Sequence, residues 1–390
     1  MSAAVIDTTL QTPTPVAIAN SAPRATQRVL HIVNGEHYAG AERVQDLLAL
    51  NLPHCGYNVQ LASLLPGKFA SCRRSQTTPL AELRMSSRWD LRVVRQLLQL
   101  IRTEQIDIVH AHTPRSALVG AIAAQWADVP FLYHLHSPTS RDSTHRLRNW
   151  LNEQVEQLSI RNAARLIAVS PTLIDHVAAL GVPREKVTCV LNGVPALDGA
   201  TPRPRPVGPW VIGMVALFRP RKGVEVLLEA LAALRAQGAD VSLRAIGGFE
   251  TPEYEADVKS LAAKLGVADA IHWTGFTREV NVELAAIDLL ALPSLFGEGL
   301  PMVVLEALAA GVPVVASDCE GVAQAVETGV NGVLVPAGDA CSLATALHAV
   351  IAGEHDYSAF SAAAIARHAE KFSDTAMARQ VAMVYAEVIR

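Results

Sequence analysis

Cysteine, aromatic residues and charged residues are all scarce in this chain of 390 residues. The five cysteines are scattered, odd in number and never in a C-x-x-C pair: Cys55, Cys72, Cys189, Cys319 and Cys341. Neither a disulfide framework nor a cysteine-bound zinc site is supported by this spacing. The cysteine usage is instead typical of the reducing cytoplasm, which is the compartment we expect.

Long uncharged hydrophobic runs are also lacking. The most apolar stretches are interrupted by Asp128, Asp288, Glu306 or proline before they reach the length of a membrane span. Residues 1–27 have neither a basic start nor a continuous apolar segment, so they are expected to form a disordered tail and not a signal peptide. Aromatic residues make up only 5% of the chain and the net charge is −4, which argues against a nucleic-acid binder.

What the chain does contain is hydrophobic residues, at 50%, against 18% charged residues. This balance suits buried parallel sheets, and the length favours two domains over one. Basic residues outnumber acidic ones in the first 200 residues, and the reverse holds afterwards. We therefore expect the first half to face an anionic partner.

The first half alternates between short apolar runs and segments of helical periodicity. Strands are expected at 28–33, 59–64, 106–110, 131–136, 166–169 and 187–191, with helices at about 41–54, 91–101 and 116–127. This βα alternation predicts one Rossmann-like, parallel-sheet domain over residues 28–195.

A proline- and glycine-rich segment at 196–209 is the expected interdomain linker. A second alternation then predicts strands at 211–215, 241–246, 271–274, 289–292, 314–316 and 332–335. We expect a second Rossmann-like domain over 210–372, and a helix at 373–390 that crosses back to the first domain. The predicted fold class is α/β, with two parallel-sheet domains facing across a cleft.

Two glutamates stand eight residues apart, at Glu298 and Glu306, around a predicted helix start at Pro301. Glu298 would lie in the loop before the helix, and the side chain of Glu306 would lean back toward its N-terminus. Two carboxylates would then converge where free backbone N–H groups and the helix dipole favour an anion. Spacing alone leaves open that both are ordinary solvated charges.

Glycine, histidine and basic residues recur just after the predicted strands, which is where open parallel sheets bind ligands. These positions are Gly35–Gly40, His110–Thr113, His136–Pro138, Ser170, Asn192–Gly193, Arg219–Gly223, Gly247–Gly248 and Gly275–Phe276. The pattern predicts a cleft that handles a phosphorylated ligand.

With these positions in hand, the chain resembles a family 4 glycosyltransferase of the GT-B fold. The motifs that carry the resemblance occur in the expected order from about residue 28 onward. They are Ala39–Glu42, Ile108–His112, Tyr133–Ser137, Ile167–Ser170, Asn192–Val194, Arg219–Gly223, the Glu298/Glu306 pair and Asn331–Asp339.

The resemblance implies a role for each matching residue. Glu306 would bind the ribose hydroxyls of a nucleotide diphosphate sugar, and Glu298 the hydroxyls of the transferred sugar. The backbone amides from Gly299 to Met302, a stretch that includes Leu300 and Pro301, would fix the sugar and phosphate. Lys222 would neutralise the diphosphate as charge grows on it.

On the other side of the cleft, the resemblance implies that His136 points at the reacting sugar and that Gly40 lets the backbone approach the phosphates. His110, His112 and Asn192 are candidate acceptor-side or cleft residues. From the residues alone, the histidines could equally be structural, because His134 shares the strand face of His136.

Two departures from the family pattern concern the donor site. Ala216 and Leu217 stand where many members carry an arginine, so Arg219 or Arg221 must supply that charge. Glu320–Gly321 replaces the usual Gly-Gly, and Gln324 replaces a common glutamate. No D-x-D pair and no H-E-x-x-H spacing occur, so neither a metal nor another cofactor is expected at the diphosphate.

The expected activity is metal-independent, retaining transfer of a hexose-type sugar from a nucleotide diphosphate sugar to a saccharide or lipid-linked acceptor, in cell-surface polysaccharide or glycolipid synthesis. Alternatives that share the fold are a nucleotide-sugar epimerase and a phosphorylase. A sugar-nucleotide-binding subunit without catalysis is an alternative of another class.

A basic stripe is the last feature. Arg84, Arg88, Arg92 and Arg95 would share one face of a helix, if the helix starts early enough. Such a face could rest on the anionic inner surface of a membrane, making the protein peripheral there, or could simply be solvated.

Overall fold

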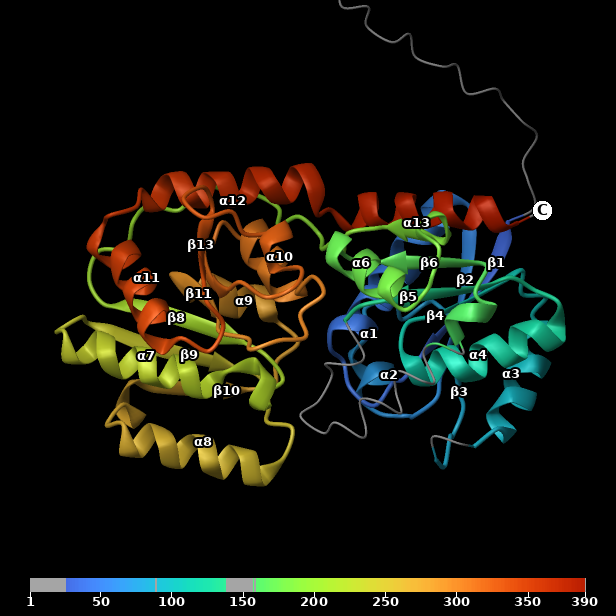
Figure 1. Ribbon diagram of the computed structural model, residues 1–390, viewed down its shortest axis with the longest axis horizontal. Helices are drawn as coiled ribbons and strands as arrows, with labels where there is room; N and C mark the ends of the chain where they lie inside the picture. The colour runs from blue at the N-terminus through green and yellow to red at the C-terminus, as the bar shows by residue number, and fades with distance from the viewer. Residues whose placement is uncertain (1–25, 88–89, 138–156, 158, 390) are drawn as a thin grey trace, which may run out of the picture.

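The chain folds into two α/β domains that lie side by side (Figure 1). The computed structural model describes residues 26–87, 90–137, 157 and 159–389. Each domain is a parallel sheet with helices on its faces, as the alternation of short apolar runs and helical segments predicts. The two-domain α/β architecture expected from the sequence is confirmed.

The N-terminal sheet has seven strands among the described residues, in the order β3-β2-β1-β4-β5-β6-β7. Its strands are β1 (Gln27–Val33), β2 (Tyr57–Ser63), β3 (Leu80–Glu82), β4 (Ile108–Ala111), β5 (Phe131–Leu135), β6 (Arg165–Ala168) and β7 (Val187–Cys189). Because β1, β4 and β5 lie at the centre, the residues that follow them meet at one edge of the sheet.

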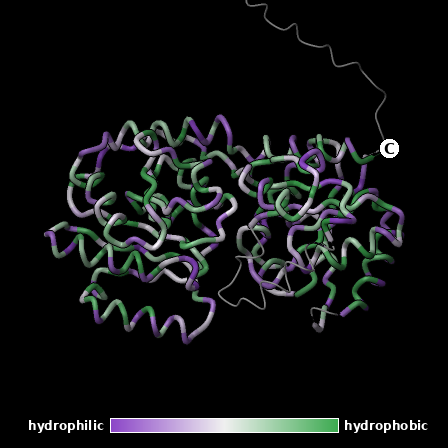
Figure 2. Tube along the Cα trace, viewed as in Figure 1, coloured by the Kyte–Doolittle hydropathy of each residue, from purple (hydrophilic) through white to green (hydrophobic). Residues whose placement is uncertain are grey.

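The C-terminal sheet has six strands in the described chain, in the order β10-β9-β8-β11-β12-β13. They are β8 (Trp210–Val215), β9 (Val241–Ile246), β10 (Ile271–Gly275), β11 (Leu289–Leu292), β12 (Val314–Ser317) and β13 (Gly332–Val335). In Figure 2, hydrophobic colour runs through the inner strands of both halves, which form the cores.

Helices connect the strands in both domains. In the N-terminal half they are α1 (Gly40–Asn51), α2 (Lys68–Cys72), α3 (Arg92–Thr103), α4 (Pro114–Ala127) and α6 (Pro171–Ala179). In the C-terminal half they are α7 (Val224–Ala236), α8 (Pro252–Lys264), α9 (Val280–Ala285), α10 (Met302–Ala309), α11 (Ala340–Ala352), α12 (Tyr357–Lys371) and α13 (Asp374–Val388). Among the described elements of the N-terminal half, α2, β3 and α6 had no predicted range, and the runs of five and three residues in α2 and β3 are too short to show a period.

Helix α4 shows how a strand end is fixed for function. Thr113 caps the helix, its side chain accepting a bond from the Ser116 N–H, while the Thr113 N–H donates to Ser116 Oγ at 3.1 Å. Pro114 occupies the first helical position, where it lacks only an N–H that would have no helical partner. This capping box holds the turn directly after His112 in one conformation.

The last helix, α13, lies against the N-terminal domain, whereas α12 lies over the C-terminal domain (Figure 1). The chain passes between them at Phe372 and Ser373, where Val194 N donates to Phe372 O at 2.8 Å. On α13, Met377, Val381 and Tyr385 are buried, and the helix packs beside α1. The final helix therefore belongs to the core of the domain that begins the chain.

The segment between the domains has neither helix nor strand over residues 196–209, and it is anchored to the C-terminal domain. The Arg203 guanidinium donates to Ala310 O at 3.0 Å, Ile287 O at 2.8 Å and Leu284 O at 3.0 Å. The composition of the segment indicated a break between domains and gave no sign of this anchor.

The proposed basic stripe is not one helix face. Helix α3 begins only at Arg92, so Arg84 lies outside it, and Arg88 lies outside the described residues. The cause is Asp90, whose carboxylate accepts from Ser86 N at 3.0 Å and from Arg92 Nε at 2.8 Å. These bonds form a turn just before the helix, and the exposed basic residues left on α3 are Arg92, Arg95 and Arg102.

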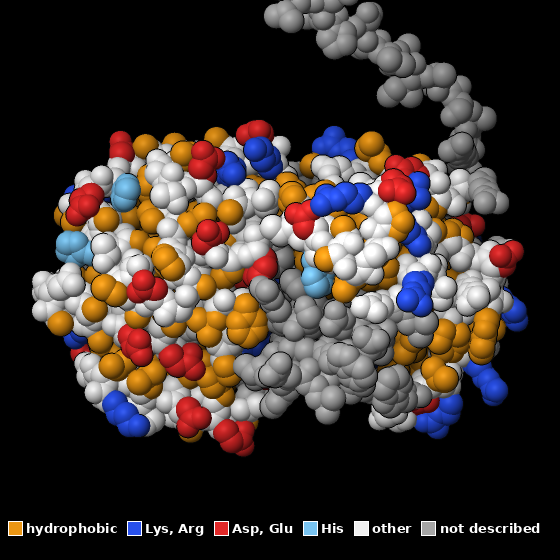
Figure 3. Space-filling model, in the orientation of Figure 1, with side chains coloured by type: hydrophobic (Ala, Val, Ile, Leu, Met, Phe, Trp, Pro, Cys, Tyr) orange, Lys and Arg blue, Asp and Glu red, His pale blue; other side chains and the backbone are white. Residues whose placement is uncertain are grey.

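The surface in Figure 3 carries acidic side chains over the lower part of the C-terminal domain, around α8, and lysine and arginine along the outer edge of the N-terminal domain. This agrees with the uneven charge of the two halves of the sequence. Within the described part of the chain, no helix combines the length and the apolar character needed to cross a membrane.

Candidate active site

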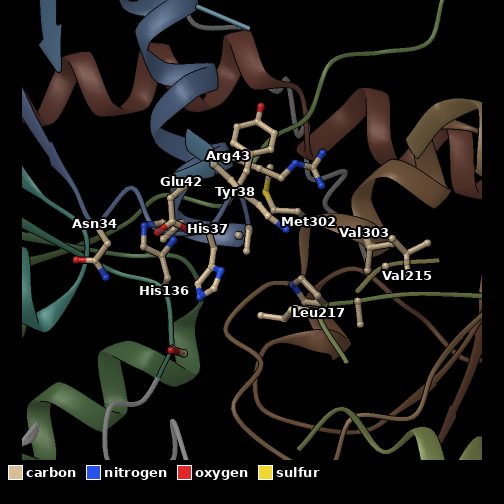
Figure 4. A pocket seen from close by; sticks show the side chains of 18 of the residues that line it. Asn34, His37, Tyr38, Glu42, Arg43, His136, Val215, Leu217, Met302 and Val303 are labelled. Carbon is tan, nitrogen blue, oxygen red and sulfur yellow. The ribbon is translucent and has the colours of Figure 1, made fainter. Parts of the chain in front are cut away.

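A cavity of about 720 Å³ lies between the two domains, at the carboxyl ends of their strands. Figure 4 shows Asn34, Glu42 and His136 from the N-terminal domain on one side and Val215, Leu217, Met302 and Val303 from the C-terminal domain on the other. Its volume suits a ligand of nucleotide-sugar size. The glycine and charged residues expected at the strand ends therefore meet at one site.

The loop between β11 and α10 brings both predicted glutamates to this cavity. Pro301 caps α10 with an extended backbone, Glu298 lies in the loop before it, and Glu306 lies inside the helix. Both carboxylates are buried and line the cavity, together with Gly299, Leu300, Pro301 and Met302. The spacing of the two glutamates thus places them as the sequence predicts.

Glu298 is paired with Lys222, which ends a short 3₁₀ helix at Pro220–Lys222. The Lys222 ammonium donates to Glu298 Oε1, Ser294 Oγ donates to the same oxygen at 2.6 Å, and Arg221 Nη1 lies 3.8 Å away. Burial alone would raise the pKa of Glu298, but the charges of Lys222 and Arg221 outweigh it and lower the pKa. Glu298 is therefore a carboxylate, able only to accept hydrogen bonds.

The two neighbouring arginines have different surroundings. Arg221 is buried and its Nη1 donates to Gly297 O at 3.0 Å and Phe296 O at 3.3 Å, so it holds the loop that carries Glu298. Arg219 is more exposed and lies 3.6 Å from Glu250. Both line the cavity, and Arg221 is bound to the loop backbone.

Glu306 has a partner that the sequence did not reveal. Arg43, on α1 of the N-terminal domain, donates from Nη1 to Glu306 Oε2 at 3.0 Å and from Nη2 to Oε1. The pair is bidentate and crosses the cavity from one domain to the other. Arg43 directly follows the quoted motif Ala39–Glu42, but nothing local in the sequence links it to a residue 263 positions later.

His136 lies at the end of β5, opposite the glutamate loop. Its Nε2 is 2.9 Å from Nδ1 of His112, and burial lowers the pKa of His136 to about 3, so the ring is neutral near pH 7. A Cβ on Gly299 would stand 1.9 Å from His136 O. Only glycine allows the loop of the C-terminal domain to approach His136 this closely.

The remaining predicted residues divide between the cavity and the core. Gly40 is the first residue of α1, lines the cavity, and has nothing within 4 Å of where a Cβ would stand. Asn192 Nδ2 donates to Leu300 O at 2.8 Å and so fixes the loop across the interface. His112 lines the cavity.

The expectation that His110 faces the cleft is wrong. It is fully buried, and its Nδ1 is 2.6 Å from the Tyr385 hydroxyl of α13. His110 lies on the sheet face that α13 covers, two residues before His112, which borders the cavity. The alternation of side chains along the strand shows the face but not how far a residue lies from the cleft end.

Glu320, the departure from the family's Gly-Gly, contacts the same loop. Its Oε2 accepts from Gly297 N at 3.0 Å and from Glu298 N at 3.2 Å, with Glu320 itself at a φ of 31°. The Glu320 carboxylate therefore accepts hydrogen bonds from two backbone N–H groups in the loop before α10. The side chain fixes the position of Glu298.

Glu42 is a further cavity residue to which sequence reasoning gave no role. It is buried in the first turn of α1, and burial raises its pKa to about 7. Its place in the motif Ala39–Glu42 was the available signal. The group can change its protonation state near physiological pH.

Comparison with known families matches nearly the whole folded chain. A model of the Glycosyltransferase Family 4 matches residues 38–196, and a model of the glycosyl transferases group 1 matches residues 201–367. The D-inositol 3-phosphate glycosyltransferase of Thermobispora bispora is 30% identical over 326 residues, covering 74% of each chain. The phosphatidyl-myo-inositol mannosyltransferase of Mycobacterium leprae is 29% identical over 292 residues, covering 72% of this chain and 74% of the relative.

Solved structures share the fold at lower identity. The Anabaena protein Alr3699/HepE in complex with UDP-glucose aligns with a TM-score of 0.81 and 23% identity, over 92% of this chain and 99% of its own. Sucrose-phosphate synthase from Thermosynechococcus elongatus aligns with a TM-score of 0.78 and 20% identity, over 93% and 98%. The GT-B fold and the family expected from the motifs are both confirmed: the chain belongs to glycosyltransferase family 4.

Proposed function

We propose that this glycosyltransferase moves a hexose-type sugar from a nucleotide diphosphate sugar to a saccharide or lipid-linked acceptor, with retention of configuration. The observation that carries the proposal is the convergence of Lys222, Glu298 and Glu306 on one cavity beside the start of α10. A cation, a sugar-binding carboxylate and a helix N-terminus are the groups that a diphosphate sugar requires.

The donor would lie along the loop that precedes α10. Glu306 would accept hydrogen bonds from the ribose hydroxyls, and Glu298 from hydroxyls of the transferred sugar. Free amides at the start of α10 would donate to the diphosphate, because the first N–H groups of a helix have no partner within it.

Lys222 and Arg219 would stabilise the leaving diphosphate. As the bond from the sugar to phosphate breaks, negative charge grows on the phosphate oxygen, and a cation fixed nearby lowers the barrier. In this proposal the charge comes from side chains and helix ends, and no metal ion is needed at the diphosphate. Arg221 is bound to the loop backbone, so we assign the second charge to Arg219.

Retention of configuration would require the acceptor to attack from the face that the diphosphate leaves. His136 would border that face from the N-terminal domain, because Gly299 brings the donor loop against it. With its pKa lowered to about 3, His136 would offer a neutral imidazole to a sugar hydroxyl.

The acceptor side is supported by what similar proteins are named for. Two relatives carry inositol-linked names, a third is a putative colanic acid biosynthesis glycosyltransferase of Escherichia coli, and Anabaena HepE has been solved with UDP-glucose. These support a nucleotide-sugar donor and a role in glycolipid or polysaccharide synthesis. We propose a cytoplasmic enzyme that meets lipid-linked acceptors at the inner face of the membrane.

The test is a panel of nucleotide diphosphate sugars, with thermal shift measured for binding, and hydrolysis and transfer measured for catalysis. We expect one donor to raise the melting temperature and to be consumed, and Glu306→Ala to lose both effects. Binding without turnover in the presence of acceptors would instead indicate a non-catalytic subunit. Interconversion of the free donor sugar would indicate an epimerase.

A further inference from the structure

Five histidines lie together on one face of the N-terminal sheet. They come from the three central strands or the residue just beyond: His31 on β1, His110 and His112 at the end of β4, and His134 and His136 at the end of β5. His31 and His110 are directly opposite each other in the register of β1 and β4. His31, His110 and His112 are at most 2% exposed.

In three of these rings, one nitrogen has a hydrogen-bonding neighbour and the other has none among the described residues. His31 Nε2 and His110 Nδ1 are 3.0 and 2.6 Å from the Tyr385 hydroxyl, and His112 Nδ1 is 2.9 Å from His136 Nε2. The other nitrogen of each ring, His31 Nδ1, His110 Nε2 and His112 Nε2, has no hydrogen-bond partner among the described residues.

Such orphan nitrogens are costly. A buried polar atom without a partner destabilises the folded state, and buried polar groups in native proteins are nearly always satisfied by protein, water or an ion. Here three lie in one cluster, and both nitrogens of the neighbouring His134 are also without a partner in the described chain. One ligand that accepts several lone pairs at once would satisfy them together.

We propose that His31, His110 and His112 bind a transition-metal ion of the zinc class. Each offers a ring nitrogen, and the three ligand atoms lie within 4.8 Å of one another. Tetrahedral zinc with bonds of about 2.0–2.1 Å would hold its nitrogens about 3.4 Å apart, so the rings must draw closer together when the ion binds. Imidazole suits zinc, cobalt, nickel and copper, whereas magnesium and calcium prefer oxygen.

The protonation state and the surrounding hydrogen bonds both suit a metal. Burial lowers the pKa of His31 to about 3 and lowers those of His110 and His112 well below the usual value, so all three rings are neutral near pH 7. Metal-bound histidines are normally held through their second nitrogen. Tyr385 and His136 already provide that contact for the three rings.

His134 is the candidate for the fourth ligand. Its ring lies 4.8 Å from that of His112 and 5.4 Å from that of His110, between centroids.

Because Tyr385 belongs to α13, the ion would link the last helix to β1 and β4. The site is separate from the diphosphate, whose charge is assigned to Lys222 and Arg219, so metal binding does not depend on the proposed transfer reaction.

The experiment titrates the full-length protein, first freed of metal with a chelator, with Co²⁺ and then with Zn²⁺. We expect one equivalent of Co²⁺ to give the visible d–d bands of a tetrahedral nitrogen site, and Zn²⁺ to displace it and raise the melting temperature. Absence of these bands in the wild-type protein overturns the proposal without reference to any variant.

Variants then locate the site. His31→Gln and His110→Gln are expected to abolish the bands, while His272→Gln, which changes an exposed histidine on β10, leaves them unchanged. Circular dichroism checks that the variants are folded. If His31→Gln and His110→Gln bind the metal as well as the wild-type protein does, or if His272→Gln loses binding, surface histidines hold the metal and the assignment is overturned.

Discussion

Arg43 of the N-terminal domain and Glu306 of the C-terminal domain form a bidentate ion pair across the cavity, with Nη1 3.0 Å from Oε2. In the proposed function, Glu306 binds the ribose of the donor. Arg43 takes one lone pair on each oxygen of the carboxylate, so ribose hydroxyls would have to use the remaining lone pairs or displace Arg43. We predict that donor binding displaces Arg43.

Arg43→Met is therefore expected to bind a nucleoside diphosphate several-fold more tightly than the wild-type protein. The variant removes the competing cation and keeps an unbranched apolar stem. It should also lower the unfolding free energy by roughly 1–3 kcal/mol, because Glu306 is left buried without its partner, and the partial exposure of Arg43 reduces the loss. Calorimetric titration measures the affinity. Weaker nucleotide binding would contradict the competition and indicate that Arg43 contacts the donor itself.

Replacing Lys222 should act on turnover. Lys222→Ala is expected to lower kcat by roughly 100–1000-fold, the loss seen when one group that stabilises developing charge is removed. Lys259→Ala is the matched control, because Lys259 pairs with Glu255 on the exposed face of α8. Steady-state kinetics on both variants, with circular dichroism, makes the comparison, and near-normal turnover in Lys222→Ala would refute the assignment.

The contact between Gly299 and His136 should be intolerant of any side chain. In Gly299→Ala the new Cβ would meet His136 O at 1.9 Å, so the loop or the domain interface must shift. We expect transfer to fall by about 100-fold, because a displacement of about 1 Å at a reacting centre can cost that much. Kinetics and small-angle scattering test this, and unchanged activity would mean that the domains do not approach in this way during catalysis.

The buried histidines predict sensitivity to acid. The pKa values of His31 and His136 are lowered to about 3 in the folded protein, against 6.5 as the usual value, so the unfolded chain binds more protons between these pH values. Their contribution to stability is complete above pH 6.5 and is lost as the pH falls toward 3. Each such group contributes a slope of at most about 1.4 kcal/mol per pH unit in that window.

His134→Gln tests this slope. Burial also holds the pKa of His134 well below the usual value, and the substitution removes one titrating ring. The variant should lose less unfolding free energy than the wild-type protein between pH 6.5 and 5.5, as measured by urea unfolding in the presence of a chelator. An identical pH dependence for the two proteins would show that His134 binds its proton at the same pH in the folded protein as in the unfolded chain.

Local patterns in the sequence were sufficient for the fold and for half of the site. The apolar runs and the turn residues after them predicted the long strands, and the Glu298/Glu306 spacing around Pro301 predicted the donor-side loop. Elements too short to show a repeating pattern, such as β3, gave no signal. The start of α3 was predicted within one residue, but the basic stripe needed an earlier start, and the Asp90 turn that prevents it depends on side-chain bonds that periodicity does not record.

The residue pairs that meet across long sequence distances could not be predicted from the sequence for a different reason. Arg43 and Glu306 are 263 residues apart, and no local preference relates them. His110 was assigned to the cleft because it comes at the end of a predicted strand, yet its ring contacts Tyr385 on α13, 275 residues later. Long-range pairs of this kind are set by how the domains pack.

The position of α13 affects how the protein is made. A chain is synthesised from its N-terminus, and domains commonly begin to fold while translation continues. Here β1 to β7 leave the ribosome before the C-terminal domain, but the helix that covers their histidine-bearing face is translated after that domain. The N-terminal domain is thus completed only after the C-terminal domain has been translated, and until then His31 and His110 lack the hydroxyl of Tyr385.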